Sequence, residues 1–182
     1  GEQGCFSHLA SLEIFPNAEI KFCSTFEETF RLAKENAKYK IIIPIENSLA
    51  GRVADIHYLI PKYKLQVHAE HFHKVSHNLL GIKGSKMKDI KTVRSHSQAI
   101  GQCQKIILDN NLKPIIAADT AGSARFIFEK KDKSEAAIAS ELAAKIYNLE
   151  ILKSNVEDEF GNVTRFFIMG KESSHPELRD KK

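Results

Sequence analysis

Short apolar runs alternate with amphipathic stretches along most of the chain. Residues 41–45 and 135–139 are largely apolar runs of strand length, while apolar residues recur every three or four positions across residues 26–37. The latter pattern predicts a helix with one buried face, and Thr25 and Glu28 stand at its start with the spacing of a capping box. Strands that alternate with helices predict an α/β fold with a mainly parallel sheet covered by helices.

The same patterns predict the remaining elements. Further strands are expected at residues 65–69, 77–82, 92–94, 114–118 and 163–169. Further helices are expected where apolar residues recur at helical spacing, over residues 49–60, 100–107 and 142–149. Asn47 and Ser48 would then lie between the end of a strand and the start of a helix.

Composition narrows the class of protein. The chain has 182 residues, of which 42% are hydrophobic and 27% charged, as is typical of a globular domain with its own core. Its net charge of +4 is dispersed along the chain, which favours no nucleic-acid partner. The longest apolar runs fall far short of the roughly 18 residues that span a bilayer, so no membrane segment is expected. Three widely separated cysteines without metal-ligand spacing favour the cytoplasm.

Four histidines, His68, His71, His73 and His77, lie close together in a segment that looks like an extended surface strand. No cysteine or pair of carboxylates lies at a suitable spacing to complete a zinc site with them. The sequence therefore predicts no metal.

Four turns deliver small polar residues to the predicted start of a helix, at residues 4–7, 46–48, 95–98 and 119–123. Helix N-termini offer unpaired N–H groups, and several around one crevice bind carboxylates or phosphates. Each turn taken singly is better explained as an ordinary N-cap, because serine, threonine, asparagine and aspartate are the commonest capping residues. The residues alone thus indicate a small-anion site and no particular reaction.

Read together, these segments resemble the catalytic domain of the prephenate dehydratase family over nearly the whole chain. The motifs that carry the resemblance occur in the family's order, at residues 1–7 (GEQGCFS), 44–48 (PIENS), 77–81 (HNLLG), 95–103 (SHSQAIGQC), 119–124 (DTAGSA) and 162–166 (NVTRF).

The resemblance implies a two-lobed fold like that of the type II periplasmic binding proteins, with the active site in the cleft between the lobes. Lobe one would use residues 1–75 and 160–182, and lobe two residues 76–159. Family members usually have a strand just before the first glycine motif, and by the resemblance this first strand of lobe one would be missing here. The regulatory ACT domain that commonly follows would also lie outside these residues, and Ser97 stands where the family usually has proline.

The resemblance also implies roles for residues. Thr164 would give a hydrogen bond or relay a proton to the leaving hydroxyl of the substrate. Arg165 would bind a carboxylate, although neighbours in a regular strand point to opposite faces, so Arg165 could instead support the loop. Phe166 would exclude water or pack in the core. The remaining substrate-binding residues would be Ser7, Asn47, Ser48, Ser95, Gln98, Gln102, Thr120, Ala121, Gly122 and Ser123.

The activity implied is the decarboxylating dehydration of prephenate to phenylpyruvate, with no cofactor, by a cytoplasmic dimer or tetramer. An arogenate dehydratase uses the same framework, and a binding protein of the same fold without catalysis is a further alternative. Glu46 is either a general acid or a structural hydrogen-bond acceptor. His96 is expected to cap or pack rather than to react, because nothing in its spacing supplies a partner for it.

Overall fold

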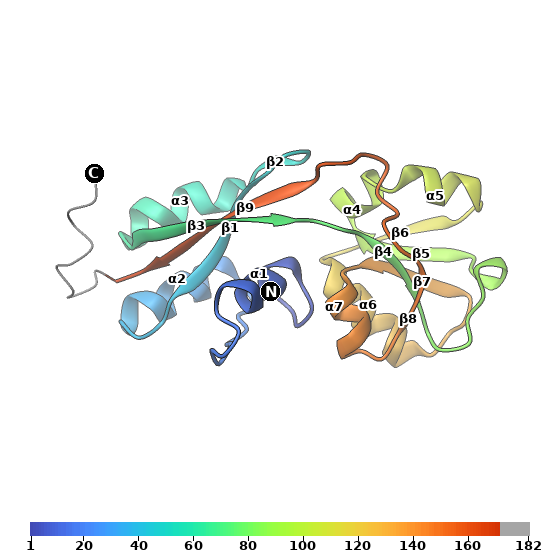
Figure 1. Cartoon of the computed structure of the whole chain (residues 1–182), viewed down its shortest axis with the longest axis horizontal. Helices are drawn as coiled ribbons and strands as arrows, with labels where there is room; N and C mark the ends of the chain where they lie inside the picture. The colour runs from blue at the N-terminus through green and yellow to red at the C-terminus, as the bar shows by residue number, and fades with distance from the viewer. Residues whose placement is uncertain (172–182) are drawn as a thin grey trace.

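A computed structural model of the chain describes residues 1–171, so residues 172–182 of the expected lobe one lie outside it. The described residues form two lobes, each built on one β-sheet and flanked by helices (Figure 1). This confirms the α/β class. None of the described helices is long and apolar enough to cross a membrane.

Lobe one contains a four-stranded sheet in the order β2-β1-β9-β3. All its strand pairs are antiparallel, so the expectation of a mainly parallel sheet is wrong for this lobe. The reason is topological, because β9 returns from the other lobe and inserts between β1 and β3. Its elements are α1 (Phe6–Ile14), α2 (Phe26–Glu35), β1 (Ile41–Asn47), β2 (Gly51–Arg52), α3 (Ala54–Tyr63), β3 (Gln66–Lys74) and β9 (Val163–Gly170).

Lobe two contains a five-stranded sheet in the order β6-β5-β7-β4-β8, in which β5 is parallel to both β6 and β7. A helix follows each of these parallel strands, so α4, α6 and α7 begin at the same end of the sheet, where the strands have their carboxyl ends. The elements are β4 (Asn78–Gly81), a 3-10 turn (Met87–Asp89), β5 (Thr92–His96), α4 (Ser97–Gly101), α5 (Gln104–Asp109), β6 (Lys113–Ala117), α6 (Thr120–Lys130), β7 (Glu135–Ala139), α7 (Glu141–Ile146) and β8 (Glu150–Lys153).

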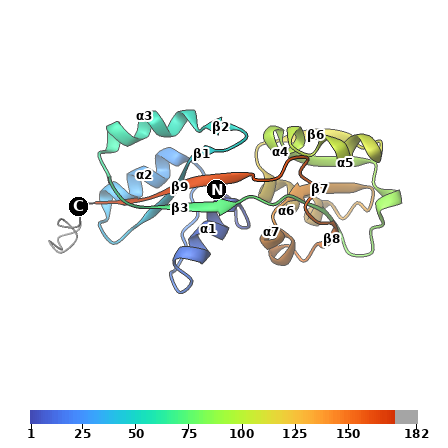
Figure 2. The ribbon, with the colours of Figure 1, turned by 45° about the horizontal axis from the view of Figure 1, so that its top comes forward.

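The chain crosses between the lobes twice, after β3 and before β9. These two strands pair along their length in lobe one, and their continuations run side by side toward lobe two (Figure 2). The residues on both crossings are therefore held close to each other and to both lobes.

The segment after β1 does not start a helix, contrary to the sequence-based expectation. It forms a tight turn into β2, α3 begins only at Ala54, and Leu49 is exposed. The Asn47 side chain explains the turn, because its Oδ1 accepts hydrogen bonds from the N–H groups of Leu49 and Ala50. Gly51 completes it with a φ of +80°.

The helix expected over residues 100–107 is broken in two, at the junction of α4 and α5. Asp158 accounts for the break. Its backbone N–H donates to the Gln102 carbonyl at 2.7 Å, and its carboxylate accepts from the N–H groups of Gln104 and Lys105. A residue from the second crossing thus caps α5 and ends α4.

One edge of β1 is open. Residues 41–44 pair with β9 on one side, while β2 pairs only with Glu46 and Asn47 on the other. Beside this edge lies a cavity of about 280 Å³, lined by residues of α1, the segment 18–23 and residues 41–43.

Candidate active site

Thr164 lies on β9 between Asn47 of β1 and His73 of β3, which are its direct partners in the sheet register. Directly paired residues of antiparallel strands place their side chains on the same face. Asn47, Thr164 and His73 therefore form a polar row across the sheet, and Thr164 is only 9% exposed.

The hydrogen bonds of Asn47 determine the role of the Thr164 hydroxyl. Because Asn47 Oδ1 already accepts from the turn that follows β1, its Nδ2 must be the group that faces Thr164. Asn47 Nδ2 donates to Thr164 Oγ1 at 3.0 Å and to Asn162 Oδ1 at 2.6 Å. Thr164 is thus an acceptor in this bond, which leaves its own O–H available to donate to another molecule.

The network continues from Asn162 into lobe two. Asn162 Nδ2 donates to Gln102 Oε1 at 3.0 Å, and His77 Nε2 lies 2.9 Å from the same oxygen. An amide oxygen can only accept, so the His77 proton is on Nε2. With Oε1 occupied twice, the NH₂ group of Gln102 is the part of this side chain that can serve a ligand.

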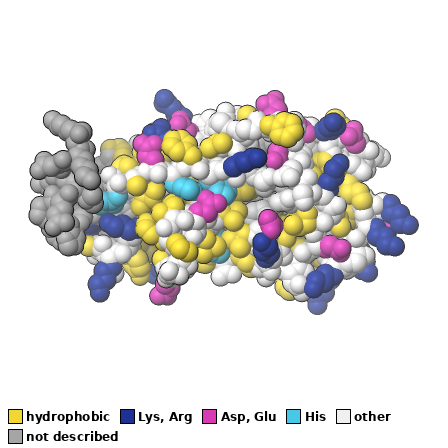
Figure 3. All heavy atoms as spheres, viewed as in Figure 1, with side chains coloured by type: hydrophobic (Ala, Val, Ile, Leu, Met, Phe, Trp, Pro, Cys, Tyr) yellow, Lys and Arg dark blue, Asp and Glu magenta, His cyan; other side chains and the backbone are white. Residues whose placement is uncertain are grey.

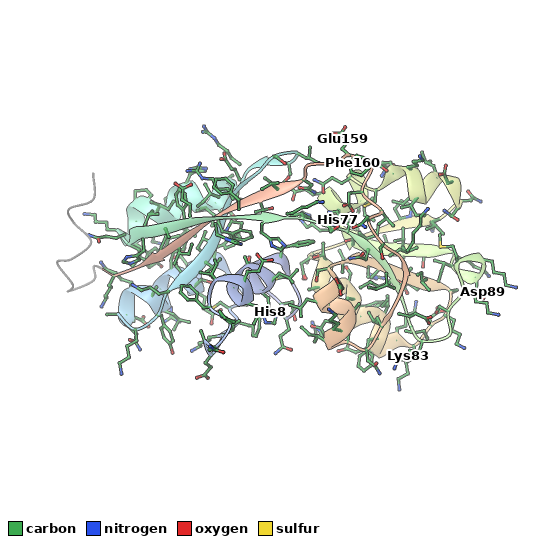
Figure 4. All side chains as sticks on the ribbon, in the orientation of Figure 1. His8, His77, Lys83, Asp89, Glu159 and Phe160 are labelled. Atoms are coloured by element: carbon green, nitrogen blue, oxygen red, sulfur yellow. The ribbon has the colours of Figure 1, made fainter. Side chains whose placement is uncertain are left out.

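His77 lies on the first crossing, where the two lobes meet (Figure 4). It is 3% exposed, and the Phe6 ring packs edge-on against it with ring centres 5.5 Å apart. Burial lowers the pKa of His77, against the opposing effects of Gln102 and Glu157. Its Nδ1 has no hydrogen-bond partner among residues 1–171. A second proton on the ring would be buried without an acceptor, so His77 is neutral.

Ser48 fastens the second crossing to lobe one. Its Oγ donates to the Gly161 carbonyl and accepts from the Val163 N–H, each at 3.0 Å. Ser48 therefore positions the segment that carries Asn162.

Arg165 points to the opposite face of the sheet from Thr164. Its Nη1 lies 3.1 Å from Glu46 Oε1, and its Nε lies 2.8 Å from Glu70 Oε2. The hydrogen bond from Arg165 lowers the pKa of Glu70. Of the two expectations for Arg165 and for Glu46, this geometry favours the structural one in both cases.

Phe166 is 1% exposed and lies in the core. It follows Arg165 on β9 and so returns to the face of Thr164.

The polar side chains in the turns of lobe two form hydrogen bonds mainly within that lobe. Asp119 caps α6 through the Gly122 N–H, and Ser123 Oγ donates to the Asp119 carbonyl at 2.7 Å. Ser95 Oγ donates to the Ile138 carbonyl at 2.6 Å. His96 Nδ1 accepts from the Gln98 N–H, as the capping expectation has it.

The structure thus joins part of the expected site and leaves part unjoined. Asn47, Ser48, Gln102 and Thr164 come together around the crossings. Gln98 is linked to that group only through the backbone, since the Gln102 N–H donates to the Gln98 carbonyl at 3.0 Å. No side-chain hydrogen bond between described residues connects the group to Ser7, Ser95, Gln98, Thr120, Ala121, Gly122 or Ser123.

Two cavities lie near these residues. Ser7 lines the cavity beside the open edge of β1. A second cavity, of about 460 Å³, lies between the lobes, and its lining does not include Thr164, Asn47 or Gln102. Its walls are Phe6, Leu9, His73, Lys74, Ser76, Asn78, Ser140, Glu141, Ile151, Ser154 and Asn155.

Two members of the network, Asn162 and His77, had no assigned role in the sequence-based site. Both stand inside motifs that carry the family resemblance, NVTRF and HNLLG, which is the signal that could have identified them. Spacing alone could not, because Asn47 and Asn162 are 115 residues apart.

Comparisons with known proteins agree over nearly the whole chain. A family profile described as "Prephenate dehydratase" matches residues 1–174. The chain is 40% identical over 171 residues to the "Bifunctional N-acyl-homoserine lactone acylase/prephenate dehydratase" of Komagataeibacter europaeus, covering 94% of this chain and 61% of that protein. It is 38% identical over 176 residues to "Arogenate dehydratase/prephenate dehydratase 1, chloroplastic" of Arabidopsis thaliana, covering 97% and 45%.

A solved structure titled "GqqA- a novel type of quorum quenching acylases" superposes with a TM-score of 0.89 at 39% identity, covering 96% of this chain and 63% of that one. The chain spans 45–61% of the length of the two curated relatives. Since the family profile matches all but the last residues, the chain belongs to the prephenate dehydratase family.

Proposed function

We propose that this chain catalyses the conversion of prephenate to phenylpyruvate at the Thr164 network. One observation carries the proposal: Thr164 Oγ1 accepts a hydrogen bond from Asn47, so its own proton is available at the point where the two lobes meet. A proton donor for a leaving hydroxyl is what this reaction asks of the protein.

The reaction balances without a redox cofactor. The bond between the ring and its carboxylate breaks, carbon dioxide leaves, and the electron pair of that bond enters the ring. The bond between the ring and its hydroxyl breaks with its electron pair, and the departing hydroxide takes up one proton to become water. The ring becomes aromatic, which drives the reaction.

Thr164 would donate the hydrogen bond to the departing hydroxyl. A threonine hydroxyl is a weak acid at neutral pH, so it acts as a relay, and solvent or a neighbour supplies the proton. Asn47 fixes the direction of the Thr164 hydroxyl, and the Gln102 NH₂ group would donate to the substrate from lobe two.

The substrate carboxylates would be bound mainly by lobe two. α4, α6 and α7 begin at the same end of its sheet, and α6 begins with Thr120 and Ala121, whereas the Gly122 N–H is already bonded to Asp119. N–H groups at helix starts bind carboxylates without help from a guanidinium. In this proposal Arg165 supports the turn after β1 through Glu46 instead of contacting the substrate.

Arogenate is the second candidate substrate, because the curated Arabidopsis thaliana relative carries both dehydratase names. Arogenate differs from prephenate by an ammonium group in place of the ketone. No described residue of the Thr164 network carries a carboxylate that would select it.

The experiment is a direct assay on the purified chain. Prephenate, arogenate and an N-acyl-homoserine lactone are offered separately, and phenylpyruvate, phenylalanine and free acid are measured. We expect phenylpyruvate to form fastest, and Thr164→Ala to abolish most of it. Tight binding of prephenate without turnover would contradict the proposal and favour a binding protein. Light scattering on the same sample tests the expected dimer or tetramer.

A further inference from the structure

Two histidines of β3 and one glutamate of α1 meet on the surface of lobe one that faces away from α3. His71 and His73 are two residues apart on β3, so their side chains project from the same face of the strand. Glu13 lies in the last turn of α1, which packs against β3. Histidine and acidic side chains adjoin in this region in the space-filling view (Figure 3).

The contacts among the three side chains are close. Glu13 Oε2 lies 2.8 Å from His71 Nε2 and 3.0 Å from His73 Nδ1. One nitrogen from each ring and one carboxylate oxygen all fall within 4.8 Å of one another. Two imidazoles and a carboxylate therefore converge on a single small volume.

We propose that Glu13, His71 and His73 bind one divalent transition-metal ion, with Zn²⁺ as the preferred ion. Neutral imidazole nitrogens and a carboxylate oxygen are typical ligands of Zn²⁺. His73 stands beside Thr164 in the polar row, but the hydrogen bonds of the Thr164 network include none of these three side chains.

Metal binding would require all three ligand pairs to adjust, since the imidazole nitrogens of His71 and His73 lie within 4.8 Å of each other and would have to approach to tetrahedral spacing. Tetrahedral ligands at the usual Zn–N and Zn–O distances lie about 3.3 Å from each other. The two Glu13 contacts must lengthen by a few tenths of an ångström, and the Glu13 side chain is 47% exposed and free to shift. His73 is fixed more firmly, because it is 7% exposed and packs against the Phe6 ring.

The ion has access and an open coordination position. The exposed Glu13 side chain borders solvent, and His73 also lines the cavity between the lobes. Three protein ligands leave the fourth position of a tetrahedral ion to water or to a small molecule. A carboxylate with two neutral imidazoles also leaves the bound ion with a net charge of +1, which suits an anionic fourth ligand.

Sequence spacing could not reveal this group, because Glu13 precedes His71 by 58 residues. The expected absence of a metal rested on the lack of a nearby carboxylate in the sequence, and α1 supplies that carboxylate in the fold. The expected surface strand is also only partly right, since His73 is buried.

The test uses the purified chain, freed of metal by a chelator and titrated with Zn²⁺ in a calorimeter. The matched variants are Glu13→Gln and His71→Ala, which both lie at least partly on the surface. The matched control is His68→Ala, an exposed histidine of the same strand whose Nε2 contacts Lys40. Substitution of Co²⁺ provides a second readout, because tetrahedral Co²⁺ absorbs visible light strongly.

We expect one Zn²⁺ per chain, a melting temperature that rises with Zn²⁺ concentration, and a Co²⁺ spectrum of tetrahedral type. Glu13→Gln and His71→Ala should each weaken Zn²⁺ binding by about tenfold or more, because even the loss of a group that only orients a ligand costs that much, while His68→Ala leaves it unchanged. Lack of stoichiometric binding, or equal weakening by His68→Ala, would overturn the proposal and leave the three side chains as a hydrogen-bonded cluster. Circular dichroism of each variant shows whether it is folded.

Discussion

The two lobes are built on different principles. In lobe two, β4 and β7 are buried at every position, and alternate residues feed separate cores on the two faces of the sheet. Leu79 and Ile138 belong to one core, Leu80 and Ala137 to the other. Lobe one has one main core cluster among its described residues, and its sheet leaves part of β1 unpaired on one edge.

The difference suggests that lobe two mainly supports the site and that lobe one carries the reacting group. In lobe two the side chains of His96, Asp119 and Ser140 accept hydrogen bonds from N–H groups at the starts of α4, α6 and α7. Lobe one instead carries a polar row across its sheet, and Thr164 stands in the middle of it. The contrast predicts that substitutions in lobe one change the reaction, while those in lobe two change stability or binding.

The largest expected effect is that of Thr164→Ala. We expect kcat to fall by about 10²- to 10⁴-fold with a smaller change in KM, because the hydroxyl acts mainly in the transition state. Steady-state kinetics with prephenate measure it. Thr164→Ser keeps the hydroxyl and should retain most activity. The comparison between lobes is sharpened by Ser123→Ala, whose hydroxyl is bonded within α6 and should matter less. Equal losses would contradict the division.

The next largest effect concerns the contact that joins the lobes at Gly4. This glycine has a φ of +85°, and an added Cβ would lie 2.7 Å from Ala143 Cα of α7. Gly51 has a similar φ of +80° but no neighbour within 4 Å. We expect Gly51→Ala to cost roughly 1–2 kcal/mol of folding free energy through backbone strain alone, and Gly4→Ala to cost clearly more. Urea denaturation measures both, and equal costs would show that the contact is not tight.

A smaller effect is expected from pH. Burial lowers the pKa of His77 below its ordinary value of 6.5, so the unfolded chain binds its proton more readily than the folded chain does. The contribution of a neutral His77 is therefore full above about pH 6.5 and is lost as the pH falls toward its folded pKa. His77→Gln should make the free energy of unfolding depend less on pH in this range. Urea denaturation at a series of pH values measures it, and a pH dependence unchanged by His77→Gln would refute the assignment.

The smallest effect is expected for Arg165→Lys. Its contacts with Glu46 and Glu70 lie on the face opposite Thr164, where solvent weakens ion pairs. Lysine keeps the charge, so we expect a kcat close to that of the parent chain and a modest change in KM. Steady-state kinetics decide the point. A collapse of substrate binding would restore Arg165 as a direct carboxylate ligand.

Local patterns were good predictors of elements. Half of the capping box of α2 is confirmed, since the Glu28 N–H donates to Thr25 Oγ1 at 3.0 Å. The Glu28 carboxylate accepts from the N–H and hydroxyl of Ser24 instead of from the Thr25 N–H. Strands at residues 41–45, 114–118 and 163–169 were placed close to β1, β6 and β9. Hydrophobic periodicity indicates which residues are buried, and this pattern can be recognised within a short stretch of sequence.

Long-range partners could not be predicted in this way. The antiparallel order of lobe one depends on β9 arriving from the other lobe, and the break between α4 and α5 depends on Asp158. The site shows the same limit, because the meeting of Asn47 with Asn162 depends on the crossings. The family resemblance supplied Thr164, Asn47 and Gln102, but not the direction of the bonds that connect them.

His77 and Asn162 lie on the two separate crossings, and both hold the same oxygen of Gln102. Any change in the angle between the lobes must move the two connecting segments relative to that oxygen, and so must alter both bonds together. Asn47 donates hydrogen bonds to both Asn162 and Thr164, so a displacement of Asn162 also affects Thr164. A change in the angle between the lobes would in consequence also change the orientation of the Thr164 hydroxyl.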